Sequence, residues 1–145
     1  MTLSALQIAQ AYSVFANQGN FIELNLFKEN SFAEPLNERV INVETNQKIV
    51  DMLVRTVNSE GGTASKAKLT KWVVAGKTGT AKETMETETT YTATFAGFAP
   101  HDSPEFLAVV VLHGLSGDDY SGGKVSAPLF SSIMEQIFLL RDLEI

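Results

Sequence analysis

The sequence contains no cysteine, and it has only two histidines in 145 residues. The absence of cysteine excludes thiol catalysis, disulfide bridges and thiolate zinc sites. His101 and His113 each stand alone, with no second histidine at a spacing that would let two imidazoles share a metal. We therefore expect neither a metal nor any other cofactor.

Basic side chains are also few. The chain has 11 lysines and arginines against 17 aspartates and glutamates, which gives a formal net charge of -6 and a pI near 4.9. Nucleic-acid binding depends on clustered basic groups that displace counterions from phosphates, so we expect no DNA or RNA partner. The longest apolar run, Phe106 to Leu112, is far shorter than the roughly 20 residues that a membrane helix needs. We expect neither a signal peptide nor a membrane anchor within these 145 residues.

Hydrophobic residues make up 44% of the chain, which suffices for one core. Ser4 and Gln7 form a capping box, and Gly19 is placed to end a helix in a left-handed conformation, so residues 5–18 are predicted to be helical. A second apolar stripe predicts a helix over residues 44–59. Residues 21–27 read as a short extended segment.

The second half of the chain is rich in β-prone residues. A strand is predicted from Trp72 into Lys77-Thr78-Gly79-Thr80, and two more over 91–98 and 106–113, with a polar loop at 82–90. Phe106 to Leu112 is apolar at both parities, which predicts a strand inside the sheet, covered on both faces. The short links favour antiparallel pairing, and the fold class is therefore α+β.

The last predicted element is a C-terminal helix. Ser126 is expected to cap it, and Pro128 suits its first turn. A stripe of four aliphatic residues at helical spacing is expected to face the sheet: Leu129, Ile133, Ile137 and Leu140. The antiparallel sheet would then lie between N-terminal and C-terminal helices.

Gly76-Lys77-Thr78 invites two interpretations. A nucleotide phosphate loop would need another glycine five residues before Gly76, where Lys71 stands, and a helix after the lysine, so this interpretation fails on spacing. The alternative is one wall of an acyl-transfer site carried on a strand. Lys77 would raise the local positive potential in the site, which favours a substrate carboxylate that Thr78 could bind. Gly79 would let an extended peptide approach the strand edge. Thr80 would supply a backbone N–H.

The surrounding segments decide between these interpretations. In chain order they resemble the C-terminal part of the transpeptidase domain of class B penicillin-binding proteins, most of all the division-type penicillin-binding protein 3 group. The segments that carry the resemblance are Thr2–Tyr12, Gly61–Ala64, Ala75–Ala81, Phe95–Pro100 and Tyr120–Phe130. The resemblance covers essentially the whole chain, so residues 1–145 would be the C-terminal part of one transpeptidase domain.

The resemblance implies a serine D,D-transpeptidase that cross-links peptidoglycan stem peptides ending in D-Ala-D-Ala and is acylated by β-lactams. By position, Lys77 and Thr80 would be catalytic, with Thr80 as the oxyanion residue, while Thr78 and Gly79 would bind substrate. The family further implies division proteins as possible partners, and a parent protein anchored in the inner membrane with this domain facing the periplasm.

In the family, the nucleophile motif Ser-x-x-Lys and the second motif Ser-x-Asn should both lie well before the Lys-Thr-Gly motif, and neither is present there in this chain. Literal Ser-x-x-Lys matches begin at Ser65, close to Lys77, and at Ser121, after it; both lie in glycine-adjacent loops and are expected to be chance. We therefore expect a fragment or one piece of a nicked domain, inactive alone until the N-terminal part of the domain supplies the serine. The alternative is a non-catalytic module that binds peptidoglycan or a division partner.

Overall fold

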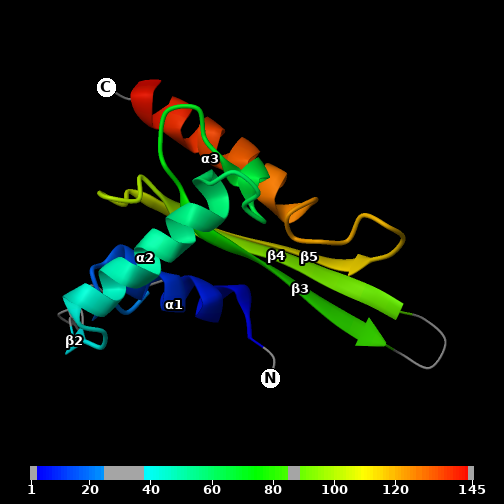
Figure 1. Ribbon diagram of the computed structural model, residues 1–145, viewed down its shortest axis with the longest axis horizontal. Helices are drawn as coiled ribbons and strands as arrows, with labels where there is room; N and C mark the ends of the chain where they lie inside the picture. The colour runs from blue at the N-terminus through cyan, green and yellow to red at the C-terminus, as the bar shows by residue number, and fades with distance from the viewer. Residues whose placement is uncertain (1–2, 25–37, 85–88, 144–145) are drawn as a thin grey trace, which may run out of the picture.

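The computed structural model describes residues 3–24, 38–84 and 89–143 (Figure 1). Within these ranges, three α-helices, a 3-10 helix and five strands follow one another. They are α1 (Ala5–Ala16), β1 (Asn20–Phe21), β2 (Glu38–Arg39), α2 (Val43–Asn58), the 3-10 helix Ser65–Ala67, β3 (Ala75–Thr84), β4 (Thr89–Ala99), β5 (Phe106–Leu115) and α3 (Ser126–Leu143). This arrangement confirms the predicted α+β class. None of the helices in the described ranges is long and apolar enough to cross a bilayer.

The main sheet is antiparallel with the strand order β3-β4-β5. Helix α3 lies against one face, and α1 and α2 lie against the other (Figure 1). Each face has its own buried cluster: Phe95 and Phe130 belong to the α3 side, and Phe98 and Leu53 to the α1–α2 side. The sheet is therefore the middle of three layers.

The predicted start of α1 is confirmed. The Ser4 side chain accepts a hydrogen bond from the Gln7 N–H at 3.2 Å, and the Ser4 N–H donates to Gln7 Oε1 at 2.8 Å. The helix ends at Ala16, two residues earlier than predicted, and Gly19 follows with a φ of +87°. A Cβ at Gly19 would lie 2.1 Å from the Ile41 carbonyl oxygen, so only glycine fits this turn.

Two other predicted boundaries need adjustment. Helix α2 covers Val43–Asn58 instead of 44–59. Residues at both ends of the expected loop 82–90 belong to strands, because β3 continues to Thr84 and β4 begins at Thr89. Glu83, for example, pairs with Thr90. The predicted extended segment 21–27 falls partly outside the described residues.

Strand β5 is covered on both faces, by α1 and α3, as predicted. Among the described residues it pairs with β4 alone, so its position inside the complete sheet stays a prediction. Short connections join β3 to β4 and β4 to β5, so β4 lies between the other two strands. The continuously buried run is accordingly on β4, at Phe95–Ala99.

The prediction for α3 is wrong in two respects. Ser126 is the first helical residue and not its cap, because the Gly122 carbonyl accepts from the N–H groups of Ser126 (3.1 Å) and Ala127 (2.8 Å). The buried face is also a different one. Leu129, Ile133 and Leu140 are 41%, 39% and 61% exposed, and of the predicted stripe only Ile137 packs against the core. The core itself is filled by Phe130, Met134 and Phe138.

Aromatic contacts explain this choice of face. The Phe130 ring lies 4.5 Å from that of Phe95 on β4, centroid to centroid, and Phe138 stacks on Trp72 at 4.0 Å. Large rings bury more apolar area than leucine or isoleucine does, and they find partners here that the aliphatic stripe would not have.

We predict that Phe130→Ala lowers the free energy of unfolding by about 3–5 kcal/mol, because it removes a fully buried ring and leaves a cavity. Urea denaturation followed by circular dichroism measures this loss. The matched control is Met52→Ala on α2, whose side chain is 64% exposed and whose removal should change stability by no more than about 0.5 kcal/mol. Equal losses in the two variants would contradict this assignment of the core.

Candidate functional site

Lys77, Thr78, Gly79 and Thr80 lie on β3, as predicted. They pair in register with Ala96, Phe95, Thr94 and Ala93 of β4. Strand β3 has no second strand neighbour among the described residues, so the motif occupies an edge of the sheet. The strand begins at Ala75, later than the β-prone run from Trp72 suggested.

Helix α2 occupies the first part of this edge. Asn58 Nδ2 donates to the Val74 carbonyl at 2.8 Å, and the Thr56 hydroxyl donates to the Gly76 carbonyl. Because an antiparallel strand directs the N–H and C=O of alternate residues to the same side, Thr78 and Thr80 also point theirs away from β4. In the described part of the chain, Lys77 Nζ is the partner of the Thr78 carbonyl, at 3.0 Å. The edge open to a ligand therefore begins at Thr78.

A buried ring packs on the α3 face of the motif strand. A Cβ on Gly76 would lie 2.5 Å from Phe95 Cζ, and one on Gly97 would lie 2.9 Å from Phe95 Cε1. The Phe95 ring thus lies over two facing glycines, one on each strand. A Cβ on Gly79, by contrast, would lie 3.7 Å from Thr94 Cβ, which is ordinary contact.

The segment that follows β5 contacts the threonines of the motif. The Gly122 N–H donates to Thr80 Oγ1 at 3.1 Å, and a Cβ on Gly123 would lie 3.9 Å from Thr78 Cγ2. Tyr120 stacks on Tyr91 of β4, with ring centroids 3.7 Å apart. The sequence had marked this segment for its resemblance alone. Its contact with Thr80 was missed, and the Gly122-Gly123 pair was the signal that could have suggested it.

The arrangement offers one cation, two hydroxyls and free main-chain groups along a strand edge. Such an edge can accept an extended peptide by main-chain hydrogen bonds, while the exposed Lys77 ammonium and the Thr78 hydroxyl can attract a carboxylate. Neither literal Ser-x-x-Lys match shows a side-chain hydrogen bond between its serine and its lysine among the described residues. Lys124 Nζ bonds Asp119 Oδ1 at 2.8 Å rather than Ser121, and its ammonium holds the pKa of the Asp119 carboxyl below its usual value. Ser65 lies in the 3-10 helix.

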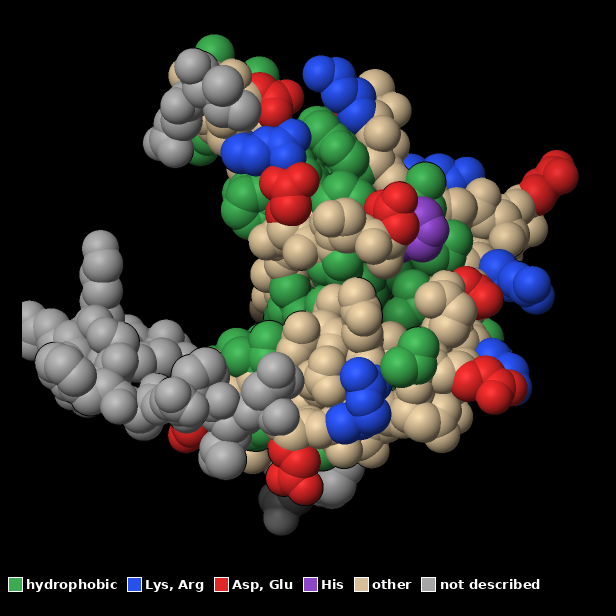
Figure 2. All heavy atoms as spheres, turned by 90° about the vertical axis from the view of Figure 1, so that its left-hand side faces the viewer, with side chains coloured by type: hydrophobic (Ala, Val, Ile, Leu, Met, Phe, Trp, Pro, Cys, Tyr) green, Lys and Arg blue, Asp and Glu red, His purple; other side chains and the backbone are tan. Residues whose placement is uncertain are grey.

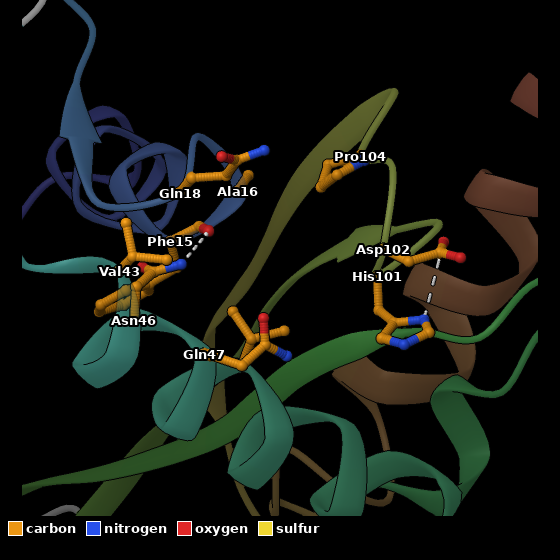
Figure 3. Close-up of a pocket in the computed structure, with 10 residues that line it drawn as sticks. Phe15, Ala16, Gln18, Val43, Asn46, Gln47, His101, Asp102 and Pro104 are labelled. Carbon is orange, nitrogen blue, oxygen red and sulfur yellow. Dashed lines mark hydrogen bonds and ion pairs between the residues drawn. The ribbon is translucent and has the colours of Figure 1, made fainter.

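A cavity of about 350 Å³ lies at the other end of the sheet, between α1, α2 and the β4–β5 turn (Figure 3). Figure 2 shows this end of the molecule, where hydrophobic side chains alternate with charged ones. Phe15, Asn46 and His101 line the cavity, and Asn46 Nδ2 donates to the Phe15 carbonyl at 3.1 Å. No lining residue comes from β3 or from the Tyr120–Gly123 segment, so the cavity is separate from the motif.

Comparisons with known proteins agree with this geometry. The family model of the penicillin-binding protein transpeptidase domain matches residues 1–135. A probable peptidoglycan D,D-transpeptidase PbpC of Pseudomonas aeruginosa is 33% identical over 92% of this chain, and peptidoglycan D,D-transpeptidase FtsI of Escherichia coli is 31% identical over 99%. The transpeptidase domain of Burkholderia pseudomallei penicillin-binding protein 3 superposes with a TM-score of 0.80 at 32% identity over 99% of this chain.

The chain therefore belongs to the penicillin-binding protein transpeptidase domain family. It spans only part of its relatives. It covers 24% of the PbpC and FtsI sequences and 43% of the solved Burkholderia pseudomallei domain.

We predict that alanine at the two glycines flanking Lys77 and Thr78 changes the free energy of unfolding by very different amounts. Gly76→Ala forces the Phe95 ring to move and should cost about 1–3 kcal/mol of unfolding free energy. Gly79→Ala meets no close atom and should leave stability within about 0.5 kcal/mol. Urea titration of both variants provides the comparison. A Gly79→Ala protein as unstable as Gly76→Ala would show that the edge is more crowded than the structure indicates.

Proposed function

We propose that the protein containing this chain is a peptidoglycan D,D-transpeptidase that cross-links stem peptides during septal wall synthesis and is acylated by β-lactams. The observation that carries the proposal is the motif Lys77–Thr80 on the open edge of β3, in a chain of the transpeptidase family. Relatives named peptidoglycan D,D-transpeptidase, among them FtsI of Escherichia coli, support the activity.

In the proposed reaction, a serine Oγ attacks the carbonyl carbon of the penultimate D-alanine. The bond to the terminal D-alanine breaks, that residue leaves as the free amino acid, and the acyl group passes from the serine to an amine of a second stem peptide. The outward-facing N–H of Thr80 would stabilise the oxyanion formed at each step, which is usually a large contribution to catalysis.

Lys77, Thr78 and Gly79 bind and polarise the substrate in this proposal. The Lys77 ammonium stands close to the Thr78 hydroxyl, at 3.5 Å, so the two can share one carboxylate. Gly79 leaves room beside the strand, because it has no side chain and no crowded neighbour. The substrate would then extend the sheet beyond β3.

Residues 1–145 form, on this proposal, the C-terminal part of a single domain whose N-terminal part carries the serine. Two surfaces support a close fit to such a part. The outer edge of β5 has no strand partner among the described residues, and α3 exposes Leu129, Ile133 and Leu140. Unpaired edges and apolar faces are usually covered in a native protein.

The cellular setting follows the same reasoning. We place the domain in the periplasm, on a parent protein anchored in the inner membrane, with division proteins as neighbours. The resemblance to division-type relatives supports this placement, because cross-linking of the wall occurs outside the inner membrane.

Labelling with a fluorescent penicillin tests the activity and the roles of the motif residues. We expect the full-length protein to form a covalent adduct and the isolated 145-residue chain to form none. Lys77→Ala and Thr78→Ala in the full-length protein should each reduce the labelling rate at least about tenfold, because each removes a direct charged or polar contact. Lys48→Ala, an exposed lysine on α2, is the matched control and should label normally.

Two outcomes would count against the proposal. Unreduced labelling of both Lys77→Ala and Thr78→Ala would remove the motif from the site. A full-length protein that binds peptidoglycan but never forms the adduct would support the non-catalytic module instead.

A further inference from the structure

The segment between β5 and α3 lies on the same side of the sheet as α3 (Figure 1). Thr78 and Thr80 face this segment, because their pairing partners Phe95 and Ala93 are buried on the α3 side. Strand β3 carries the motif, but its threonine side chains are therefore contacted from a part of the chain that belongs to neither β3 nor β4.

Gly122 connects two elements through its own backbone. Its N–H donates to Thr80 Oγ1 at 3.1 Å, and its carbonyl accepts from the N–H groups of Ser126 and Ala127 at 3.1 and 2.8 Å. The buried residue Gly122 thus joins the start of α3 to the motif strand.

The fit around Gly122 excludes a side chain. A Cβ there would lie 2.6 Å from the Thr94 carbonyl oxygen, 2.7 Å from the Gly79 carbonyl oxygen and 3.2 Å from Thr78 Cβ. Two of these are main-chain atoms of paired strands, which cannot move aside easily. Only glycine allows the backbone to come this close to the sheet.

The connection is also held firmly at both ends. Tyr120, two residues before Gly122, stacks on Tyr91 with an interplanar angle of 11°. Helix α3, which begins four residues after Gly122, is anchored by Phe130 against Phe95. Because the Gly122 N–H is held in place on both sides, its hydrogen bond restricts the orientation of the Thr80 side chain.

We infer that Gly122 is a positioning residue for Thr80: its N–H fixes the Thr80 side chain, and thereby the direction of the Thr80 backbone N–H at the open edge. The inference rests on the proposed function, in which that N–H binds the oxyanion. Loss of the Gly122 bond leaves the oxyanion donor present but less well oriented. The rate should consequently fall by less than the roughly 10²–10³ that removal of an oxyanion donor costs.

Acylation of the full-length protein by a chromogenic cephalosporin, followed by stopped flow, separates the dissociation constant of the first complex from the acylation rate constant. Thr80→Val keeps the backbone N–H but removes the acceptor, and should lower the rate constant about five- to tenfold, the factor that one net hydrogen bond is worth. The dissociation constant should stay within about twofold, because a change in orientation affects the transition state and not the first complex. Thr80→Ser, which restores the acceptor, should recover most of the rate.

Gly122→Ala should lower the rate constant by a similar factor. The double variant Thr80→Val/Gly122→Ala should be no slower than either single variant, since both remove the same hydrogen bond. Thr92→Val is the matched control: its hydroxyl contacts His113 and Glu83 on the same sheet, and its loss should not alter acylation. If Gly122→Ala fails to fold, the Thr80→Val and Thr80→Ser pair still decides the matter.

Several results would overturn the inference. Thr80→Val acylated at the wild-type rate would do so, as would fully multiplicative losses in the double variant. A change confined to the dissociation constant would instead make the Thr80 hydroxyl a direct substrate contact. A wild-type protein that does not react at all would overturn the proposed function and this inference with it, which distinguishes that failure from an indifferent Thr80→Val.

Discussion

The position of the motif strand depends on one aromatic ring. Phe95 lies over Gly76 and Gly97, two glycines that face each other across the β3–β4 pair, and its other side packs against Phe130 of α3. A methyl group at either glycine would overlap the ring. The residue before Lys77 is therefore fixed by the deepest part of the core. Close-packed interiors deform little, so packing of this kind can place a site precisely.

The second constraint is the distribution of main-chain hydrogen bonds along β3. One edge is paired with β4, and the first carbonyls of the other edge are taken by Thr56 and Asn58 of α2. Helix α2 thus ends where the open edge begins. An unpaired strand edge in a soluble protein is a liability unless something covers it. In a protein whose substrate is an extended peptide, the substrate itself can serve as the missing neighbour.

Local signals in the sequence were sufficient for α1 and α2, which begin and end within two residues of their predicted bounds. The capping box at Ser4 and the left-handed Gly19 act within a few residues, so one segment contains all the information. Helix α3 differs because two apolar faces compete at helical spacing. Phe130 is buried and Leu129 is not because Phe95 stands on a strand some 35 residues away, and no local pattern contains that partner.

The site shows the same division between local and distant information. The strand that carries Lys77–Thr80 could be predicted, because β-prone residues surround the motif. The bond between Gly122 and Thr80 could not, since 42 residues separate them and a glycine pair before a helix also suits an ordinary turn. Yet the pairing of β3 with β4 and the Gly122 hydrogen bond both act on Thr80. Pairing with β4 sets the path of the strand, and it cannot by itself fix the side chain of an exposed threonine at an edge. A second contact from outside the sheet is needed, and Gly122, in the turn before α3, provides it.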